Sequence, residues 1–153
     1  MKRGALLAAA AGLMLALGTA WWLTRARLSD REQIARVIRQ IQQGVQTKNT
    51  NLILSGISRD YRDGAGLNYR DLWRAAWRLR RGQEQVRVLI PELEMTTNPD
   101  TAWVKLRAEV SVGYSEETAK HYAGRIALAL RRERGGWKVI SSGGWQSWAE
   151  EWE

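Results

Sequence analysis

The chain of 153 residues carries 24 Lys and Arg against 16 Asp and Glu, with one His and no Cys. This length suits a single domain, and the absence of Cys excludes disulfides, thiol nucleophiles, iron–sulfur clusters and Cys-based zinc sites. The formal net charge of +8 is typical of nucleic-acid-binding proteins, but half of that excess flanks one apolar segment: Lys2, Arg3, Arg25 and Arg27. Elsewhere Asp and Glu are interleaved with Lys and Arg and the remaining excess of positive charge is small, so we expect no nucleic-acid partner.

Residues 4–23 contain no charged side chain. At a rise of about 1.5 Å per residue, a helix of this length spans a hydrocarbon core of roughly 30 Å. Trp21 and Trp22 suit the headgroup level at its far end, and Arg25 and Arg27 follow as a polar stop. The segment predicts a transmembrane anchor over residues 1–27, with residues 4–23 in contact with the bilayer.

A cleaved secretory signal is the competing interpretation, because Gly18, Thr19 and Ala20 form a small-residue cleavage site. We favour the anchor, since the apolar segment continues into Trp21 and Trp22. Both interpretations place the domain outside the cytoplasm, so we expect a single-pass protein of a bacterial-type cytoplasmic membrane with an extracytoplasmic domain. The arginines that follow the segment outnumber Lys2 and Arg3 and favour the opposite orientation, which stays open.

Three helices are predicted after the apolar segment. Ser29 and Glu32 form a capping-box pattern, so a helix begins there, and its apolar stripe continues to about Lys48. A short helix follows over residues 51–57. Residues 69–81 form a third helix, in which Trp73 and Trp77 border an arginine face that we interpret as an ordinary solvated surface. Its arginines are Arg70, Arg74, Arg78 and Arg81.

Beyond Gly82 the hydrophobic period changes from 3.6 to 2, which indicates strands. Alternating residues cover 86–90, 104–112, 122–130 and 137–139, and turn signals at 98–100 and 134–136 join neighbouring strands into an antiparallel meander. Pro91 cannot donate a ladder hydrogen bond, which indicates an edge strand or a bulge. Gly143 and Gly144 indicate a turn after the last strand. Helices followed by a meander predict an α+β fold.

Five stretches together resemble the nuclear transport factor 2-like superfamily, which includes the SnoaL-like domains and has a cystatin-like fold. Between Asp30 and Trp145 they read IARVIRQIQQGVQTKN, LILSGISRDYRDGAG, VRVLIPELEM, TAWVKLRAEVSVGY and GRIALALRRERGGWKVISSGGW. The resemblance implies a cone of helices packed on a curved antiparallel sheet, with an apolar pocket inside and an outer sheet face that often forms dimers. The expected divisions are the anchor (1–27), this domain (28–145) and a Trp-rich tail (146–153).

The resemblance also implies that proton-transfer chemistry would need an acid inside the cone, paired with Tyr or His. The pocket candidates are Tyr61, Glu92, Glu94 and Tyr122, none of them assigned a catalytic role. Strand parity points both glutamates inward, but a bulge at Pro91 would turn them outward, so their side stays open. The single His121 is expected at the surface, and we expect no metal and no cofactor.

Trp145, Trp148 and Trp152 align on one side of a helix and are candidate interaction residues. Two interpretations stay open: the tail folds back on its own domain, or it docks on a membrane-protein partner. The outer sheet face, with Leu89, Ala127, Ala129 and Ile140, is a second contact surface and suits a homodimer.

We therefore expect a membrane-anchored, non-catalytic protein-interaction or assembly module. Tethering raises the effective concentration for membrane partners, which helps an assembly factor more than an enzyme of soluble metabolites. The alternative is a SnoaL-like pocket protein that binds a small molecule or transfers protons, as an isomerase or dehydratase does.

Overall fold

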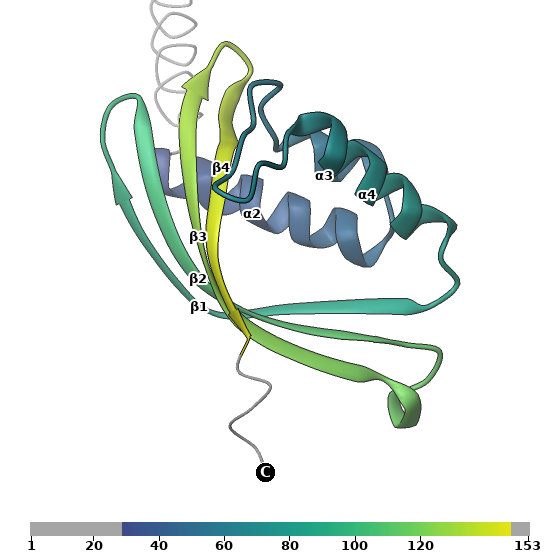
Figure 1. The fold of residues 1–153 in the computed structure, drawn as a ribbon. Helices are drawn as coiled ribbons and strands as arrows, with labels where there is room; N and C mark the ends of the chain where they lie inside the picture. Colours follow the sequence, from purple (N-terminus) through teal and green to yellow (C-terminus); the bar gives the residue numbers. More distant parts are fainter. Residues whose placement is uncertain (1–28, 148–153) are drawn as a thin grey trace, which may run out of the picture.

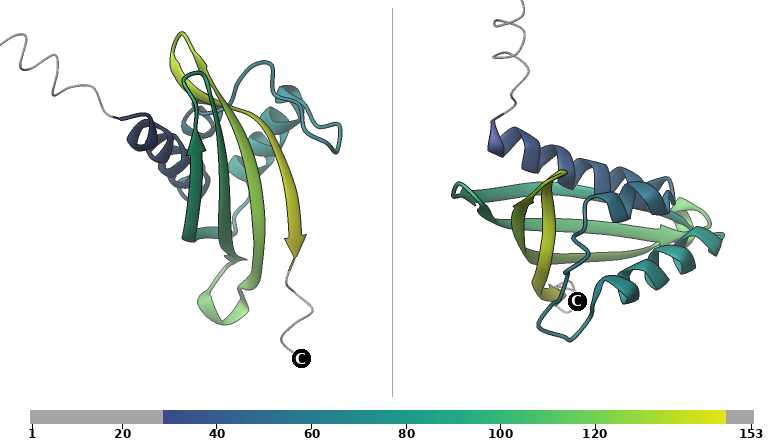
Figure 2. Two further views of the ribbon diagram at one scale, coloured as in Figure 1. Left: turned by 90° about the vertical axis from the view of Figure 1, so that its left-hand side faces the viewer. Right: turned by 90° about the horizontal axis from the view of Figure 1, so that it is seen from above.

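The computed structural model describes residues 29–147, with the backbone alone for residues 145–147. Three helices come first and a four-stranded antiparallel sheet follows, with the strands in the order β1-β2-β3-β4. The sheet bends strongly, and α2, α3 and α4 lie on its concave side (Figure 1). In the left view of Figure 2 the strands lie in front of the helices, so no described helix covers the convex face, called the outer face below. This is the expected α+β arrangement.

Each helix begins where a polar side chain caps it. α2 (Asp30–Gln46) starts with the predicted capping box, in which Ser29 N donates to Glu32 Oε2 at 2.8 Å and Glu32 N donates to Ser29 Oγ at 3.3 Å. Asn49 caps the short α3 (Thr50–Ser55). Asn68 caps α4 (Tyr69–Arg81), whose bounds are those expected from the sequence.

The strands form the predicted meander, but the first and the last are longer than expected. They are β1 (Gln85–Thr97), β2 (Thr101–Gly113), β3 (Lys120–Glu133) and β4 (Gly136–Ser147), with a short 3-10 turn, η1 (Glu116–Thr118), before β3. The turn expected at Gly143 and Gly144 is wrong: Gly143 pairs with Ala127 and the strand continues. Gly144 has a φ of 77°, which L side chains rarely adopt, and the register shifts there, so the glycines form an irregularity within β4.

The core lies between α2 and the concave face of the sheet. Ile34 and Ile38 on one side of α2 pack against alternate residues of β2, β3 and β4, because a helix spacing of four and a strand spacing of two each put apolar residues on one side. The buried strand residues of this cluster are Ala102, Val104, Leu106, Ala108, Leu130, Trp137 and Val139.

At each edge of the sheet, the backbone of one strand residue forms hydrogen bonds with a neighbouring segment. At β1, Val88 N donates to Gln46 Oε1 at 3.1 Å, and Gln42 Nε2 donates to Val88 O at 2.7 Å. At β4, Val139 N donates to Gly56 O and Val139 O accepts from Ser58 N, each at 2.9 Å. The chain after α3 therefore runs along the edge of β4 that faces away from β3.

No helix among residues 29–147 is long and apolar enough to cross a bilayer. The predicted anchor, with Trp21, Trp22, Arg25 and Arg27, lies outside the described residues, and so does the tail from residue 148 onward.

Candidate functional site

A bulge at Pro91 decides where two of the pocket candidates lie. The ladder between β1 and β2 changes register just before Glu92, which is opposite Arg107. The shift turns Glu92 and Glu94 to the outer face, where Glu92 Oε1 lies 3.6 Å from Arg107 Nη1 and Glu94 is opposite Lys105. Of the two sides that the sequence left open, the outer one is observed.

Tyr61 is buried, with only 3% of its surface exposed, and packs in the core beneath the sheet. Its hydroxyl lies 2.6 Å from Ser142 Oγ on β4 and donates to Asp63 Oδ2 at 3.2 Å. Burial raises the pKa of Tyr61, and the hydrogen bond with Ser142 acts in the opposite direction. Tyr61 therefore stays a neutral hydroxyl at neutral pH.

Tyr122 lies on the concave face, opposite Val110, yet 45% of its surface is exposed. The four pocket candidates are thus divided between two faces of the sheet, and neither Glu92 nor Glu94 approaches the Tyr61 hydroxyl. His121 is exposed, and its Nδ1 lies 2.8 Å from Ser111 Oγ. Within residues 29–147 no cluster of three His, Asp or Glu side chains could hold a metal ion.

An open cleft of about 920 Å³ lies between residues 59–62 and the first turns of α4. Its walls combine four guanidinium groups with three aromatic rings, and we call it the arginine cleft. Its lining residues are Arg59, Asp60, Tyr61, Arg62, Asn68, Tyr69, Arg70, Trp73 and Arg74.

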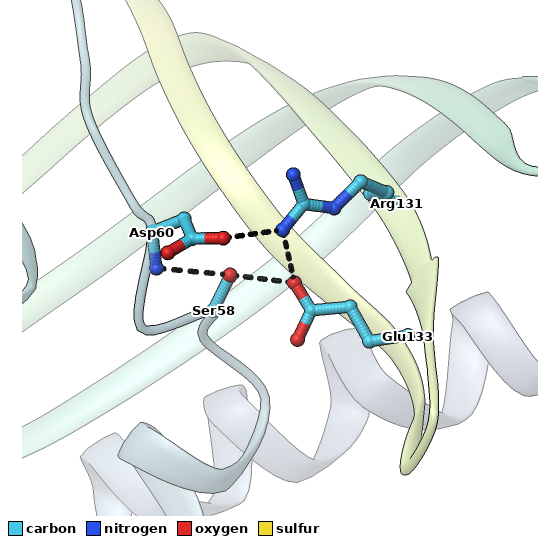
Figure 3. A network of polar contacts seen from close by, with 4 residues as sticks. All are labelled: Ser58, Asp60, Arg131 and Glu133. Atoms are coloured by element: carbon cyan, nitrogen blue, oxygen red, sulfur yellow. Dashed lines mark hydrogen bonds and ion pairs between the residues drawn. The ribbon is translucent and has the colours of Figure 1, made fainter.

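Four polar side chains hold one wall of the arginine cleft in place (Figure 3). Ser58, which is 1% exposed, donates to Glu133 Oε1 at 2.6 Å and accepts from Asp60 N at 3.1 Å. Arg131 Nη2 bridges Glu133 Oε1 at 2.7 Å and Asp60 Oδ2 at 2.8 Å. The hydrogen bond from Ser58 is the main cause that lowers the pKa of Glu133, helped by Arg131. This network fixes the segment after Ser58 to the β3–β4 hairpin.

The cleft keeps an excess of positive charge. The only carboxylate among its lining residues, Asp60, is already paired with Arg131. Arg59 lies over the ring of Tyr69, 4.6 Å from its centroid, and Arg74 Nη1 lies 3.3 Å from Asp71 Oδ1. An anion entering the cleft would meet guanidinium groups that still have N–H donors available.

The sequence profile of the SnoaL-like domain matches residues 61–144, which is more than half of the chain. The chain belongs to the SnoaL-like domain family. No curated protein matches the sequence.

Solved structures agree on the fold of this SnoaL-like domain. Bd1075 from Bdellovibrio bacteriovorus superposes with a TM-score of 0.65 and 12% identity, over 77% of this chain and 41% of that protein, so this chain spans less than half of Bd1075. An NTF2-like superfamily protein from Salmonella enterica serovar Typhimurium gives 0.63 and 9%, over 81% and 96%. A Streptomyces avermitilis protein provisionally named a dehydratase of the NTF2-like family gives 0.62 and 15%, over 72% and 91%. At these identities the likeness concerns the fold alone.

The outer face of the SnoaL-like sheet carries exposed apolar side chains among charges. Trp103 on β2 is 60% exposed and Leu89 on β1 is 53% exposed. On the same face Arg107 lies 3.6 Å from Glu92 and 3.3 Å from Glu109. A face that combines an exposed aromatic ring with paired charges has the composition of a protein contact surface.

Sequence reasoning missed two features of these surfaces. It treated Arg70 and Arg74 as a solvated helix face and did not see that Arg59 and Arg62 join them from another segment; the repeated Arg-Asp of residues 59–63 was the available signal. It also passed over Trp103, although the burial of its neighbours on β2 follows from their alternation. Trp145, Trp148 and Trp152 lie outside the side chains that the structure describes.

Proposed function

We propose that this SnoaL-like domain is a non-catalytic protein-interaction module, held at a bacterial-type cytoplasmic membrane by residues 1–27 and facing away from the cytoplasm. The observation that carries the proposal is the outward position of Glu92 and Glu94, on the same face as the exposed Trp103. The two glutamates that were candidates for the acid inside the cone instead belong to a charged outer face, which also carries an exposed aromatic.

The outer face is the proposed contact surface, and its partner is a protein at the membrane or a second copy of this chain. Trp103 supplies a large apolar anchor, and Arg107 with its two glutamates supplies charges that fix orientation. A bilayer anchor favours contacts of this kind even where they are weak, because tethering raises the local concentration of the domain near its membrane partner.

The alternative of a small-molecule pocket has less support from the described residues. The S. avermitilis relative carries the provisional name of a dehydratase. In this chain, however, the acid nearest to the Tyr61 hydroxyl is Asp63, whose Oδ1 accepts from the amides of Ala65 and Leu67. That carboxylate holds the turn before α4, a structural task.

The test is crosslinking of the full chain in membranes, followed by affinity purification. Trp103→Ser should deplete the crosslinked partner, and Tyr114→Ser, which removes another aromatic that is 69% exposed, is the matched control. Recovery of the same partner with Trp103→Ser would contradict the role of the outer face. If the double change Glu92→Gln and Glu94→Gln abolished turnover of a small molecule by the purified protein, the non-catalytic proposal would fail.

A further inference from the structure

The arginine cleft has charge that the described residues leave without a counterion. Within residues 29–147, Arg59, Arg62 and Arg70 form no ion pair with a carboxylate, and all three side chains are exposed. Several guanidinium groups gathered at one cleft repel one another, so an anion that bound between them would relieve this repulsion.

The same cleft offers rings as well as charges. Trp73 is 44% exposed and stacks at a tilt against Trp77, with their centroids 5.7 Å apart. Arginine beside Trp and Tyr is the composition of binding hot spots in protein contacts. The cleft is also open and about 920 Å³ in volume. A concave surface of this kind suits a peptide segment that carries both acids and aromatics better than it suits a flat bilayer.

The chain itself contains a segment of that chemistry. Residues 148–153 read WAEEWE, with three carboxylates, two indoles and no cation. The segment continues from Ser147 at the end of β4. β4 also carries Ser142, whose Oγ contacts the Tyr61 hydroxyl at one wall of the cleft.

The connection is long enough. The five residues from Ser142 to Ser147 cover at most about 18 Å. Four extended residues carry the backbone of Glu151 back by about 14 Å, and six carry that of Glu153 back by about 20 Å. The side chains of these glutamates and of the cleft arginines cover the remaining distance, so the segment can turn back and meet the cleft without any change in the sheet.

We infer that the arginine cleft is a binding site for an acidic, tryptophan-bearing peptide, and that residues 148–153 of the same chain occupy it. Glu150 and Glu151 pair with Arg70 and its neighbours, and an indole of the segment packs beside Trp73. The tail thereby shields the cleft, on the opposite side of the sheet from the outer-face surface proposed above.

The absence of native Cys allows a direct test by paired cysteines in the full chain. Glu153→Cys, at the far end of the segment, is combined with Ala65→Cys, an exposed position on the turn whose base is the bridge between Arg62 and Asn68 at the cleft. The control pairs Glu153→Cys with Ala127→Cys, an exposed outer-face position opposite Gly143 of β4. A short bis-maleimide should join the first pair within one chain, with a yield about fivefold above the control.

Charge reversal then tests the recognition. Arg70→Glu with Arg74→Glu should lower the yield to that of the control, and adding Glu150→Lys and Glu151→Lys should restore it. Circular dichroism of each variant is the control for an intact fold. Raising NaCl from about 50 mM to about 500 mM should also lower the yield, because salt screens exposed pairs.

Three results would overturn the inference. The first is equal crosslinking of both pairs, or a yield that ignores charge reversal. The second is crosslinking only between two chains, which assigns the tail to a second copy. The third is arginine-dependent binding of phosphatidylglycerol vesicles that is unchanged by Glu150→Lys and Glu151→Lys, which assigns the cleft to a lipid surface.

Discussion

Replacing Ser58 by Ala should destabilise the domain by about 2 kcal/mol at pH 7. Ser58 is 1% exposed and donates to Glu133 Oε1 at 2.6 Å. A hydrogen bond to a charged group contributes about 1.5–3 kcal/mol to stability. The amide of Asp60 also loses its acceptor in this variant, but Asp60 is exposed, so water can replace the lost hydrogen bond. Ala keeps the β-carbon, so the change removes the hydroxyl and little packing.

The loss should depend on pH in a stated direction. The hydrogen bond from Ser58 lowers the pKa of Glu133 below its ordinary value of 4.5. A carboxyl with a lowered pKa in the folded state contributes stability above its unfolded-state pKa, and this contribution is lost as the pH falls through the folded value. The wild type should therefore lose more stability in acid than Ser58→Ala does, and the difference between them should shrink.

Urea unfolding of the full chain, followed by circular dichroism at pH 7 and at acidic pH, measures both effects. Ser115→Ala is the matched control, because its hydroxyl bonds Thr118 at an exposed position and should change stability by less than about 0.5 kcal/mol. The reasoning is refuted if Ser58→Ala costs no more than this control at pH 7, or if its cost is the same at both pH values.

Three further changes have distinct expected results. Gly44→Ala should lower the melting temperature, because the new Cβ would lie 2.8 Å from the backbone N of Ile53. The same change stabilises most helices, so a higher melting temperature would contradict the close approach of α2 and α3. Trp137→Ala should lower the free energy of unfolding by about 3–5 kcal/mol. Trp137→Phe should lower it clearly less, since Trp137 Nε1 has no hydrogen-bond partner among the described residues. Equal losses in urea unfolding would show that the indole nitrogen matters. Wild-type stability should fall above about pH 10, because the folded state, in which the pKa of Tyr61 is raised, favours the protonated hydroxyl. Tyr61→Phe should show a weaker loss of stability at alkaline pH, and an unchanged loss would exclude Tyr61 as its source.

Local signals predicted the secondary structure well. The capping box at Ser29 and the change of period after Gly82 depend only on neighbours in the chain, and α2, α4 and the meander follow them. The exceptions are at Pro91 and Gly144, where one extra residue or a positive φ resets the strand parity. The pattern showed that Pro91 was irregular but could not say which side Glu92 would take.

The sites depend on contacts that no local pattern contains. Ser58 and Glu133 are 75 positions apart, yet their hydrogen bond helps to bring Arg59 to the same cleft as Arg70. An arginine every four residues on α4 is equally consistent with solvent and with one wall of a cleft, because the second wall comes from another segment. Sequence reasoning therefore found half of the arginine cleft and could not assemble it.

The glutamines that reach from α2 to Val88 have a consequence for self-association. An exposed strand edge is a template for cross-β growth, and here side chains of α2 bond the amide and carbonyl of Val88 on β1 while the chain after α3 bonds those of Val139 on β4. Aggregation of this domain should therefore start from a state in which α2 has detached, and a mutation that loosens α2 should shorten the lag before fibrils form even where the melting temperature barely changes.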